Sequence, residues 1–218
     1  MAISLASIQK TKHAAPPRIL IHGPEKVGKS SFFSQSPGAI FVPTEDGLNG
    51  IDTQAFPLAQ SYQDFFDGLC ILANEDHEFK TCVIDSADWL ERLIHQRVSE
   101  DDGVKSIELA GGGYGKGYLL AQNYWREVLQ TLDHLNKAKG MVVGIICHSV
   151  VVPFNDPEHE PYDRFEMKLH QSKKGMGSRD MLLEWADIVG FARGQIFVNQ
   201  KTVADGTTDP KKQAKVAR

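Results

Sequence analysis

The sequence predicts an α/β fold in which a mostly parallel central sheet is flanked by helices and followed by a C-terminal β-hairpin. Three observations support this fold class. Short apolar stretches of strand type alternate with segments whose apolar residues recur at helical spacing. A glycine-rich loop, residues 23–30, joins the first of these strands to a helix. Two later strands end in acidic residues, which is typical of parallel strands whose carboxyl ends border a ligand crevice.

The composition is that of an ordinary globular protein. The chain has 218 residues, of which 41% are hydrophobic and 24% are charged, and its formal net charge is -4. This length suits one domain with extra loops, and the charge excludes a globally basic nucleic-acid-binding protein. No apolar run reaches the length that spans a membrane. Three isolated cysteines, Cys70, Cys82 and Cys147, lack metal-ligand spacing and fit buried thiols in a reducing cytoplasm.

The expected elements alternate along a single core. A proline-containing lead-in, 1–17, precedes the core, 18–200, and a polar tail, 201–218, follows it. Helices are predicted to begin at Ser30 and Ser61, and further helices are predicted at 88–98, 118–138 and 179–186. Apolar stretches predict strands at 18–22, 39–42, 54–58, 80–85, 140–147 and 187–192, and 195–198 is expected to pair with the last of them as a hairpin.

Residue types at helix starts and along helix faces support these helices. Ser61 and Asp64 fit a capping box, and Asp88 and Glu91 are placed as the cap and the third residue of the next helix. In the longest helix an apolar stripe steps by four and three residues, so we expect this stripe to face the core. The stripe consists of Ala121, Trp125, Val128, Leu132 and Leu135.

The glycine-rich loop reads G-x-x-x-x-G-K-S, the Walker A pattern of nucleotide-binding proteins. A strand and a helix flank it, as the motif requires, which disfavours the alternative of a chance glycine-rich turn. Backbone N–H groups of such a loop wrap a chain of phosphates. Lys29 would reach the β and γ phosphates of ATP, and the Ser30 hydroxyl would bind Mg²⁺. The predicted nucleotide-binding residues are Gly23, Pro24, Glu25, Lys26, Val27, Gly28, Lys29, Ser30 and Ser31.

Three polar side chains follow buried strands near the expected end of the phosphate chain. Asp85 ends an apolar strand, as in a Walker B element, and can bind Mg²⁺ directly or through water. Glu45 follows the second strand, at the sheet edge that carries ligands in open α/β sheets. His148 follows the strand at 140–147 and is either a sensor of the γ-phosphate or a hydrogen-bonded histidine at the sheet edge.

Two segments interrupt the alternation of strands and helices. Residues 99–117 contain too many glycines for a helix or strand interior, so we expect a mobile loop there. Residues 153–180 form a second segment that is irregular and locally basic. Aromatic and basic side chains in such loops can stack on bases and contact phosphates; the alternative is a solvated surface loop. The candidates for DNA contact are Tyr114, Lys116, Tyr118, Lys168, Lys173 and Lys174.

The order of these motifs resembles the RecA-like ATPase core of the P-loop NTPases. Over about residues 18–192 the chain is similar to short phage proteins of that superfamily, which act as ATP-dependent single-strand annealing proteins or mini-recombinases. The resemblance depends on the Walker A loop, Glu45, Val-Ile-Asp-Ser at 83–86, Gly-Lys-Gly-Tyr at 115–118, His148, and Leu-Glu-Trp-Ala-Asp-Ile-Val at 183–189. Full-length recombinases carry an additional self-association domain, whereas here only a short lead-in precedes the core.

The resemblance implies an Mg²⁺-dependent, DNA-stimulated ATPase that binds single-stranded DNA and promotes annealing or strand pairing in phage recombination. Glu45 would be the general base, Lys29 and His148 would be further catalytic residues, and Asp85 would serve Mg²⁺ together with Ser30. ATP would lie between the protomers of a homo-oligomer, either a ring or a filament. A single-strand binding protein would be a further partner, in the cytoplasm of a bacterial host. The basic residues that could complete a neighbour's site are Arg164, Lys168 and Arg179.

Two other functions agree with the same residues. One is a nucleotide-gated assembly or binding module with little turnover, in which ATP orders loops or joins protomers. The other is a P-loop NTPase with a client other than DNA, such as a kinase of a small substrate. The two long glycine-bearing loops fit a polymeric client better than a small one.

Overall fold

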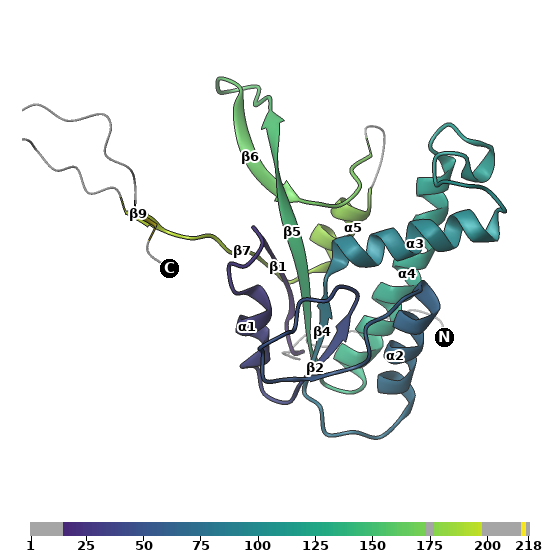
Figure 1. Cartoon of the computed structure of the whole chain (residues 1–218), viewed down its shortest axis with the longest axis vertical. Helices are drawn as coiled ribbons and strands as arrows, with labels where there is room; N and C mark the ends of the chain where they lie inside the picture. The colour runs from purple at the N-terminus through teal and green to yellow at the C-terminus, as the bar shows by residue number, and fades with distance from the viewer. Residues whose placement is uncertain (1–14, 173–176, 198–214, 217–218) are drawn as a thin grey trace, which may run out of the picture.

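A computed structural model describes residues 15–172, 177–197 and 215–216 and has the predicted α/β fold (Figure 1). Its seven-stranded sheet has the order β3-β2-β4-β5-β1-β7, and β6 pairs with β5 outside this row. Every pairing within the row is parallel, and β6 alone in this sheet runs antiparallel to its neighbour. The strands are β1 (Arg18–Gly23), β2 (Ala39–Pro43), β3 (Gln54–Ala55), β4 (Thr81–Asp85), β5 (Val142–Phe154), β6 (Tyr162–Met167) and β7 (Ile188–Phe191).

Helices cover both faces of the sheet, because alternate side chains of the central strands point to opposite sides. Ile40 and Val42 of β2 join the large core beneath α2, α3 and α4, whereas Phe41 between them joins a smaller core with Phe33 of α1. Figure 1 shows α1 on one side of the sheet and α2, α3 and α4 on the other. The helices are α1 (Lys29–Ser34), α2 (Tyr62–Asn74), α3 (Ala87–Asp101), α4 (Lys116–Lys137) and α5 (Ser178–Trp185).

Two of the three predictions made at helix starts and faces are confirmed. Ser61 and Asp64 form the capping box of α2. The predicted stripe of α4, from Ala121 to Leu135, is buried in the large core. The predicted cap of α3 is wrong, because Ser86 is its N-cap, so Asp88 and Glu91 lie inside the helix. Both carboxylates are buried there and bind residues of other segments.

The prediction of an irregular segment at 153–180 is wrong for residues 162–167, which form a strand, and for its two ends. β5 does not stop at Cys147 but continues to Phe154, and it pairs with β6 in a hairpin from Ser149–Met167 to Phe154–Tyr162. The β-branched run at 150–152 favours a strand, and Pro153 lies at a position where an edge strand tolerates proline. The hairpin extends beyond the carboxyl ends of the parallel strands (Figure 1).

The chain end and the glycine-rich segment also differ from expectation. β8 (Ile196–Phe197) pairs with β9 (Lys215–Val216) and not with β7, which instead pairs in parallel with β1. The glycine-rich segment is shorter than 99–117, because α3 extends to Asp101 and α4 begins at Lys116, with the 3₁₀ turn η2 (Ala110–Gly112) between them. In the parts of the chain that the structure describes, no helix is long and apolar enough to cross a membrane.

Candidate nucleotide site

The Walker A loop joins β1 to α1, and its two glycines are required for different reasons. Gly28 has a φ of 99°, where a side chain would be strained, and nothing lies within 4 Å of the position that a Cβ would take. Gly23 is closely packed instead, since a Cβ there would lie 2.3 Å from the Ala192 carbonyl oxygen. Lys26 also has a positive φ, of 59°. Backbone turns of this kind present N–H groups to an anion, so the loop has the geometry of a phosphate cradle.

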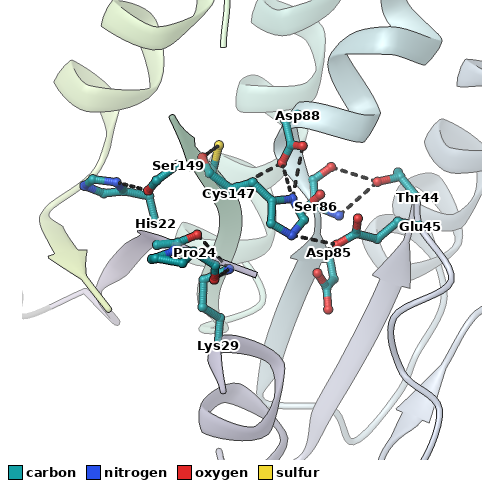
Figure 2. A network of polar contacts seen from close by, with 12 residues as sticks. His22, Pro24, Lys29, Thr44, Glu45, Asp85, Ser86, Asp88, Cys147 and Ser149 are labelled. Atoms are coloured by element: carbon teal, nitrogen blue, oxygen red, sulfur yellow. Dashed lines mark hydrogen bonds and ion pairs between the residues drawn. The ribbon is translucent and has the colours of Figure 1, made fainter. Parts of the chain in front are cut away.

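Lys29 is fixed across this loop (Figure 2). Its side chain is buried, and Nζ donates hydrogen bonds to the carbonyl oxygens of Gly23, at 3.0 Å, and Pro24, at 2.8 Å. Burial lowers the pKa of Lys29, and the nearby carboxylates of Asp85 and Glu45 oppose that shift. The ammonium group is thus held where the predicted phosphate chain would pass.

Ser30 and Asp85 meet although 55 residues separate them in the sequence. The Ser30 hydroxyl donates a hydrogen bond of 2.6 Å to Asp85 Oδ2. Burial raises the pKa of Asp85, and the hydrogen bond from Ser30 works against this shift. A hydroxyl oxygen and a carboxylate oxygen side by side fit Mg²⁺, which prefers oxygen ligands and keeps several waters or phosphate oxygens. The Ser30–Asp85 pair is therefore the candidate Mg²⁺ site. Among the described residues there is no group of three or more His, Cys, Asp or Glu that could hold a metal ion.

Glu45 is held beside Asp85 because the ends of β2 and β4 are joined by polar contacts (Figure 2). The Thr44 hydroxyl donates to the Ser86 carbonyl oxygen, at 2.7 Å, and accepts from the Ser86 backbone N–H, at 3.0 Å. The Thr44 backbone N–H donates to the Asp85 carbonyl oxygen at 2.7 Å. Glu45 therefore projects from a fixed strand end and not from a free loop.

His148 lies between two carboxylates, Glu45 and Asp88. Its Nδ1 is 3.1 Å from both Asp88 oxygens, its backbone N–H donates to Asp88 Oδ1 at 3.0 Å, and its Nε2 is 3.7 Å from Glu45 Oε1. The hydrogen bond to Asp88 raises the pKa of His148. Burial alone would raise the pKa of Asp88, but the hydrogen bonds from His148 outweigh it and leave that pKa lowered. Burial raises the pKa of Glu45, and the charge of His148 opposes the rise.

A cavity of about 790 Å³ is lined by several of these residues, Asp88 not among them, together with residues that the sequence patterns did not indicate. Trp89 and Arg92 of α3 and the loop at 46–51 belong to this second group. Asp88 was expected only as a helix cap. Its place two residues after the Ser86 N-cap could have indicated a site, since the first turn of α3 starts at the same strand end as Asp85. Lys29, Ser30, Glu45, Asp85 and His148, all predicted from sequence, do come together here.

The candidates for DNA contact are dispersed. Tyr114 is fully exposed, and Lys116 is exposed at the first position of α4. Tyr118 is half-buried and stacks on His170, with ring centroids 4.1 Å apart. Lys168 lines the nucleotide cavity of its own chain. Lys173 and Lys174 lie outside the described residues.

The remaining basic candidates both bind the carboxylate of Glu166. Arg164 Nε donates to Glu166 Oε1 at 2.6 Å, and Arg179 forms a close ion pair with Glu166 Oε2. Arg179 is 8% exposed, whereas the Arg164 guanidinium is partly accessible and lies over the Phe154 ring at 3.5 Å. Of the three residues suggested for a neighbour's site, Arg179 is thus the least accessible.

Comparison with known proteins agrees with this geometry. A profile of the family described as AAA domain matches residues 15–215 and so covers the whole sheet and the nucleotide cavity. No curated protein matches the chain. The chain is therefore a P-loop NTPase-type protein that belongs to the AAA domain family.

Proposed function

We propose that the protein is an Mg²⁺-dependent ATPase in which Glu45 is the general base, and that its client is single-stranded DNA in a phage recombination pathway. The first part is supported mainly by one observation, the position of Glu45 and His148 beside the Ser30–Asp85 pair. Phosphoryl transfer to water depends on positioning and charge stabilisation, and the charged residues that line this cavity are suited to both.

Each residue has a defined part in the proposed reaction. The backbone of the Walker A loop and Lys29 bind and orient the phosphates. Bound Mg²⁺, held by Ser30 and Asp85, would neutralise charge that develops on the phosphate oxygens. Glu45 accepts a proton from the attacking water if it comes within hydrogen-bond distance of that water. His148 favours the ionised form of Glu45 by its charge, and Asp88 orients the imidazole.

Steady-state hydrolysis of Lys29→Ala and Glu45→Gln variants tests this assignment. Lys29→Ala is expected to abolish turnover. Glu45→Gln should bind ATP with little change but hydrolyse it at least about 100-fold more slowly, the usual contribution of a general base. Glu100→Gln, an exposed change on α3, is the matched control. Equal loss of binding and turnover in Glu45→Gln would mean that Glu45 has a structural role. Absence of turnover by the unmodified protein, with ATP binding retained, would favour the nucleotide-gated module.

The choice of single-stranded DNA as client is supported by the resemblance in sequence and by the glycine-rich segment before α4. There the fully exposed ring of Tyr114 lies two residues before the exposed Lys116, a combination that suits base stacking and phosphate contact. The tip of the β5–β6 hairpin is unfavourable for DNA, since it carries Asp156, Glu158 and Glu160. We therefore place the proposed DNA contact at 110–118 and not at the hairpin tip.

Fluorescence anisotropy of labelled single-stranded DNA tests the client. Binding should strengthen with an ATP analogue and Mg²⁺ relative to ADP, and should weaken as salt rises, because phosphate contacts release counterions. A Tyr114→Ala, Lys116→Ala double variant should bind more weakly while it retains the basal rate of hydrolysis. No binding in any nucleotide state at low salt would remove DNA as the client and leave the ATPase assignment unaffected.

The proposal includes self-association, with ATP at the interface between protomers. Light scattering after size-exclusion chromatography, with and without an ATP analogue, gives the mass directly. A nucleotide-dependent increase in mass supports the proposed homo-oligomer, whereas a monomer in every nucleotide state argues against it.

A further inference from the structure

We infer that Arg92 is a further catalytic residue of the nucleotide site, acting on the terminal phosphate within its own chain, and that Trp89 positions it. The inference rests on the proposed ATPase function. It concerns two residues of α3 that no sequence motif indicated and that line the nucleotide cavity together with residues of the Walker A loop.

The two side chains reach the cavity because α3 starts where β4 ends. Asp85 is the last residue of β4, Ser86 is the N-cap, and Trp89 and Arg92 follow on successive turns of the same helix face. The centre of the Arg92 guanidinium lies 4.2 Å from the centroid of the Trp89 ring, which is the geometry of a cation–π pair. Asp88 and Glu91 point away into the protein, so the helix presents a buried acidic side and a cavity-facing cationic side.

Arg92 differs from most arginines of the protein in having free hydrogen-bond donors. Within the described residues its guanidinium makes no ion pair or hydrogen bond, and the Trp89 ring is its sole polar or aromatic contact. Other arginines are bound to carboxylates: Arg18 to Asp187 and Asp133, Arg97 to Asp101, and Arg164 and Arg179 to Glu166. A planar cation with its donors free, fixed by an aromatic ring at a phosphate cavity, is suited to bidentate contact with phosphate oxygens.

The position of α3 assigns Arg92 to the terminal phosphate. In the proposed site Lys29 contacts the β and γ phosphates and Ser30 binds Mg²⁺. The Ser30 hydroxyl donates a hydrogen bond to Asp85, which lies directly before the N-cap of α3. Glu45, the proposed base, lines the same cavity as Asp85 and is close enough for the two charges to interact. A cation there can stabilise charge on the transferred group as it develops. Arginines supplied in this way within one chain or by a partner contribute about 10³-fold or more to turnover.

Four variants separate a catalytic role from a structural one. Arg92→Ala should lower kcat on the order of 10³-fold. By isothermal titration calorimetry it should also weaken binding of a non-hydrolysable ATP analogue while leaving ADP affinity unchanged. Arg92→Lys should restore only part of the rate, since an ammonium group cannot form the bidentate contact. Trp89→Phe should have a kcat near that of the unmodified protein, because it keeps an aromatic ring beside the Arg92 guanidinium. Trp89→Ala removes the ring and should lower kcat. Arg97→Ala, on the same helix but outside the cavity, is the control.

Mixing variants distinguishes action within one chain from action on a neighbour. Lys29→Ala subunits keep Arg92, and Arg92→Ala subunits keep an intact Walker A loop. If Arg92 acts within its own chain, the mixture should hydrolyse no more ATP than the two variants do separately. Recovery of activity on mixing would overturn the assignment and make Arg92 a residue that acts on the neighbouring site.

The outcomes for Arg92 and for the ATPase proposal are separable. If the unmodified protein does not hydrolyse ATP, the proposed function fails. In that case a selective loss of analogue affinity in Arg92→Ala still supports the phosphate contact. The inference would be overturned if Arg92→Ala bound the ATP analogue and ADP each as tightly as the unmodified protein does and had the same kcat. If Arg92→Ala lost DNA binding without any change in hydrolysis, the inference would also be overturned. The Arg92 guanidinium would then be a contact for a phosphate of the DNA.

Discussion

At the scale of single residues, the charge of His148 is controlled by two neighbouring carboxylates. Its imidazole is bonded to Asp88 on one side and faces Glu45 on the other. The contact with Asp88 raises the pKa of His148, which keeps the ring protonated to higher pH than a free histidine. A protonated ring in turn opposes the rise that burial causes in the pKa of Glu45, so the charges of His148 and Glu45 depend on each other.

Replacing Asp88 with Asn should therefore lower the pKa of His148. The amide keeps the size of the side chain and still accepts a hydrogen bond, but it no longer provides the negative charge that favours the imidazolium. An NMR titration of the His148 ring follows the change directly. An unchanged His148 pKa in Asp88→Asn would show that Glu45 or burial controls the ring instead.

Sequence reasoning identified the residues whose place follows from a motif or from a strand end. Lys29 and Ser30 have fixed places in the Walker A pattern. Glu45 and Asp85 lie at the ends of apolar strands, and His148 follows the apolar part of β5 at the same edge of the sheet. Trp89 and Arg92 could not be identified in this way. Their role depends on which face α3 turns to the cavity, and that is decided by packing of α3 against α4 and β5.

At the scale of elements, the position of α1 determines whether the Walker A residues are in place. This helix has only six residues, so its own hydrogen bonds cannot keep it stable. It is anchored by Phe33, which is 1% exposed and packs against the sheet directly over Gly144 of β5. A glycine at this position of a central strand is required by the close approach of the ring.

Gly144→Ala should destabilise the protein and weaken nucleotide binding together. A Cβ at this position would lie 2.5 Å from the Phe33 ring, so the ring and α1 must move. Overpacking of this kind costs about 1–3 kcal/mol in a well-packed core. Urea unfolding measures the loss, and calorimetry measures ADP affinity. Gly190→Ala on β7 is the matched control, since its Cβ would meet its nearest atom at 3.6 Å. Unfolding curves that coincide for Gly144→Ala and the control would contradict this role of Gly144.

The β5–β6 hairpin shows where prediction of elements from sequence fails. Two prolines, Pro153 and Pro157, and the Asn155-Asp156 pair favoured a loop, because each is common in turns. In the structure the first proline is part of a strand edge and the rest form the hairpin turn. Local residue preferences cannot show that 162–167 is available as a partner for β5, and that partner is what extends the strand.

At the scale of the whole molecule, Glu91 joins α3 to the segment that follows β6. Its carboxylate accepts a hydrogen bond from the His170 backbone N–H, at 2.9 Å, and a close one from the Ser178 hydroxyl. Burial raises the pKa of Glu91 to about 7 from its usual 4.5, although these hydrogen bonds oppose the rise. The folded protein thus binds a proton at Glu91 that the unfolded chain releases near pH 4.5.

Stability should therefore fall as pH rises from about 4.5 to about 7, because in this interval folding takes up a proton at Glu91. The full effect of this shift is on the order of 3 kcal/mol. Glu91→Gln lacks this pH-dependent contribution. As pH rises through that interval, the Tm of the unmodified protein should therefore fall relative to the Tm of the variant. Glu100→Gln, exposed on the same helix, should follow the unmodified protein. A pH-independent Tm difference for Glu91→Gln would show that Glu91 is not protonated in the folded state near neutral pH.

The fold class followed from the sequence, but the order of strands did not. Alternating strands and helices with a Walker A loop predict a parallel sheet, and the sheet is parallel apart from β6. The insertion of β5 between β1 and β4 depends on contacts such as Ile19–Gly144 and Val83–Gly144, between residues far apart in sequence. No local pattern encodes such pairs, whereas burial of a continuous apolar strand on both faces selects them in the folded chain.

The length of β5 has a mechanical consequence. This strand of 13 residues begins in the centre of the sheet, passes His148 at the nucleotide cavity, and continues without a break to Phe154 at the hairpin. From His148 to Phe154 it forms a lever arm of about 20 Å at the usual rise of a strand. A rotation of about 5° at His148 would move the far end of such an arm by about 2 Å. A small rotation of the strand at the cavity would thus become a larger displacement at the tip of the hairpin.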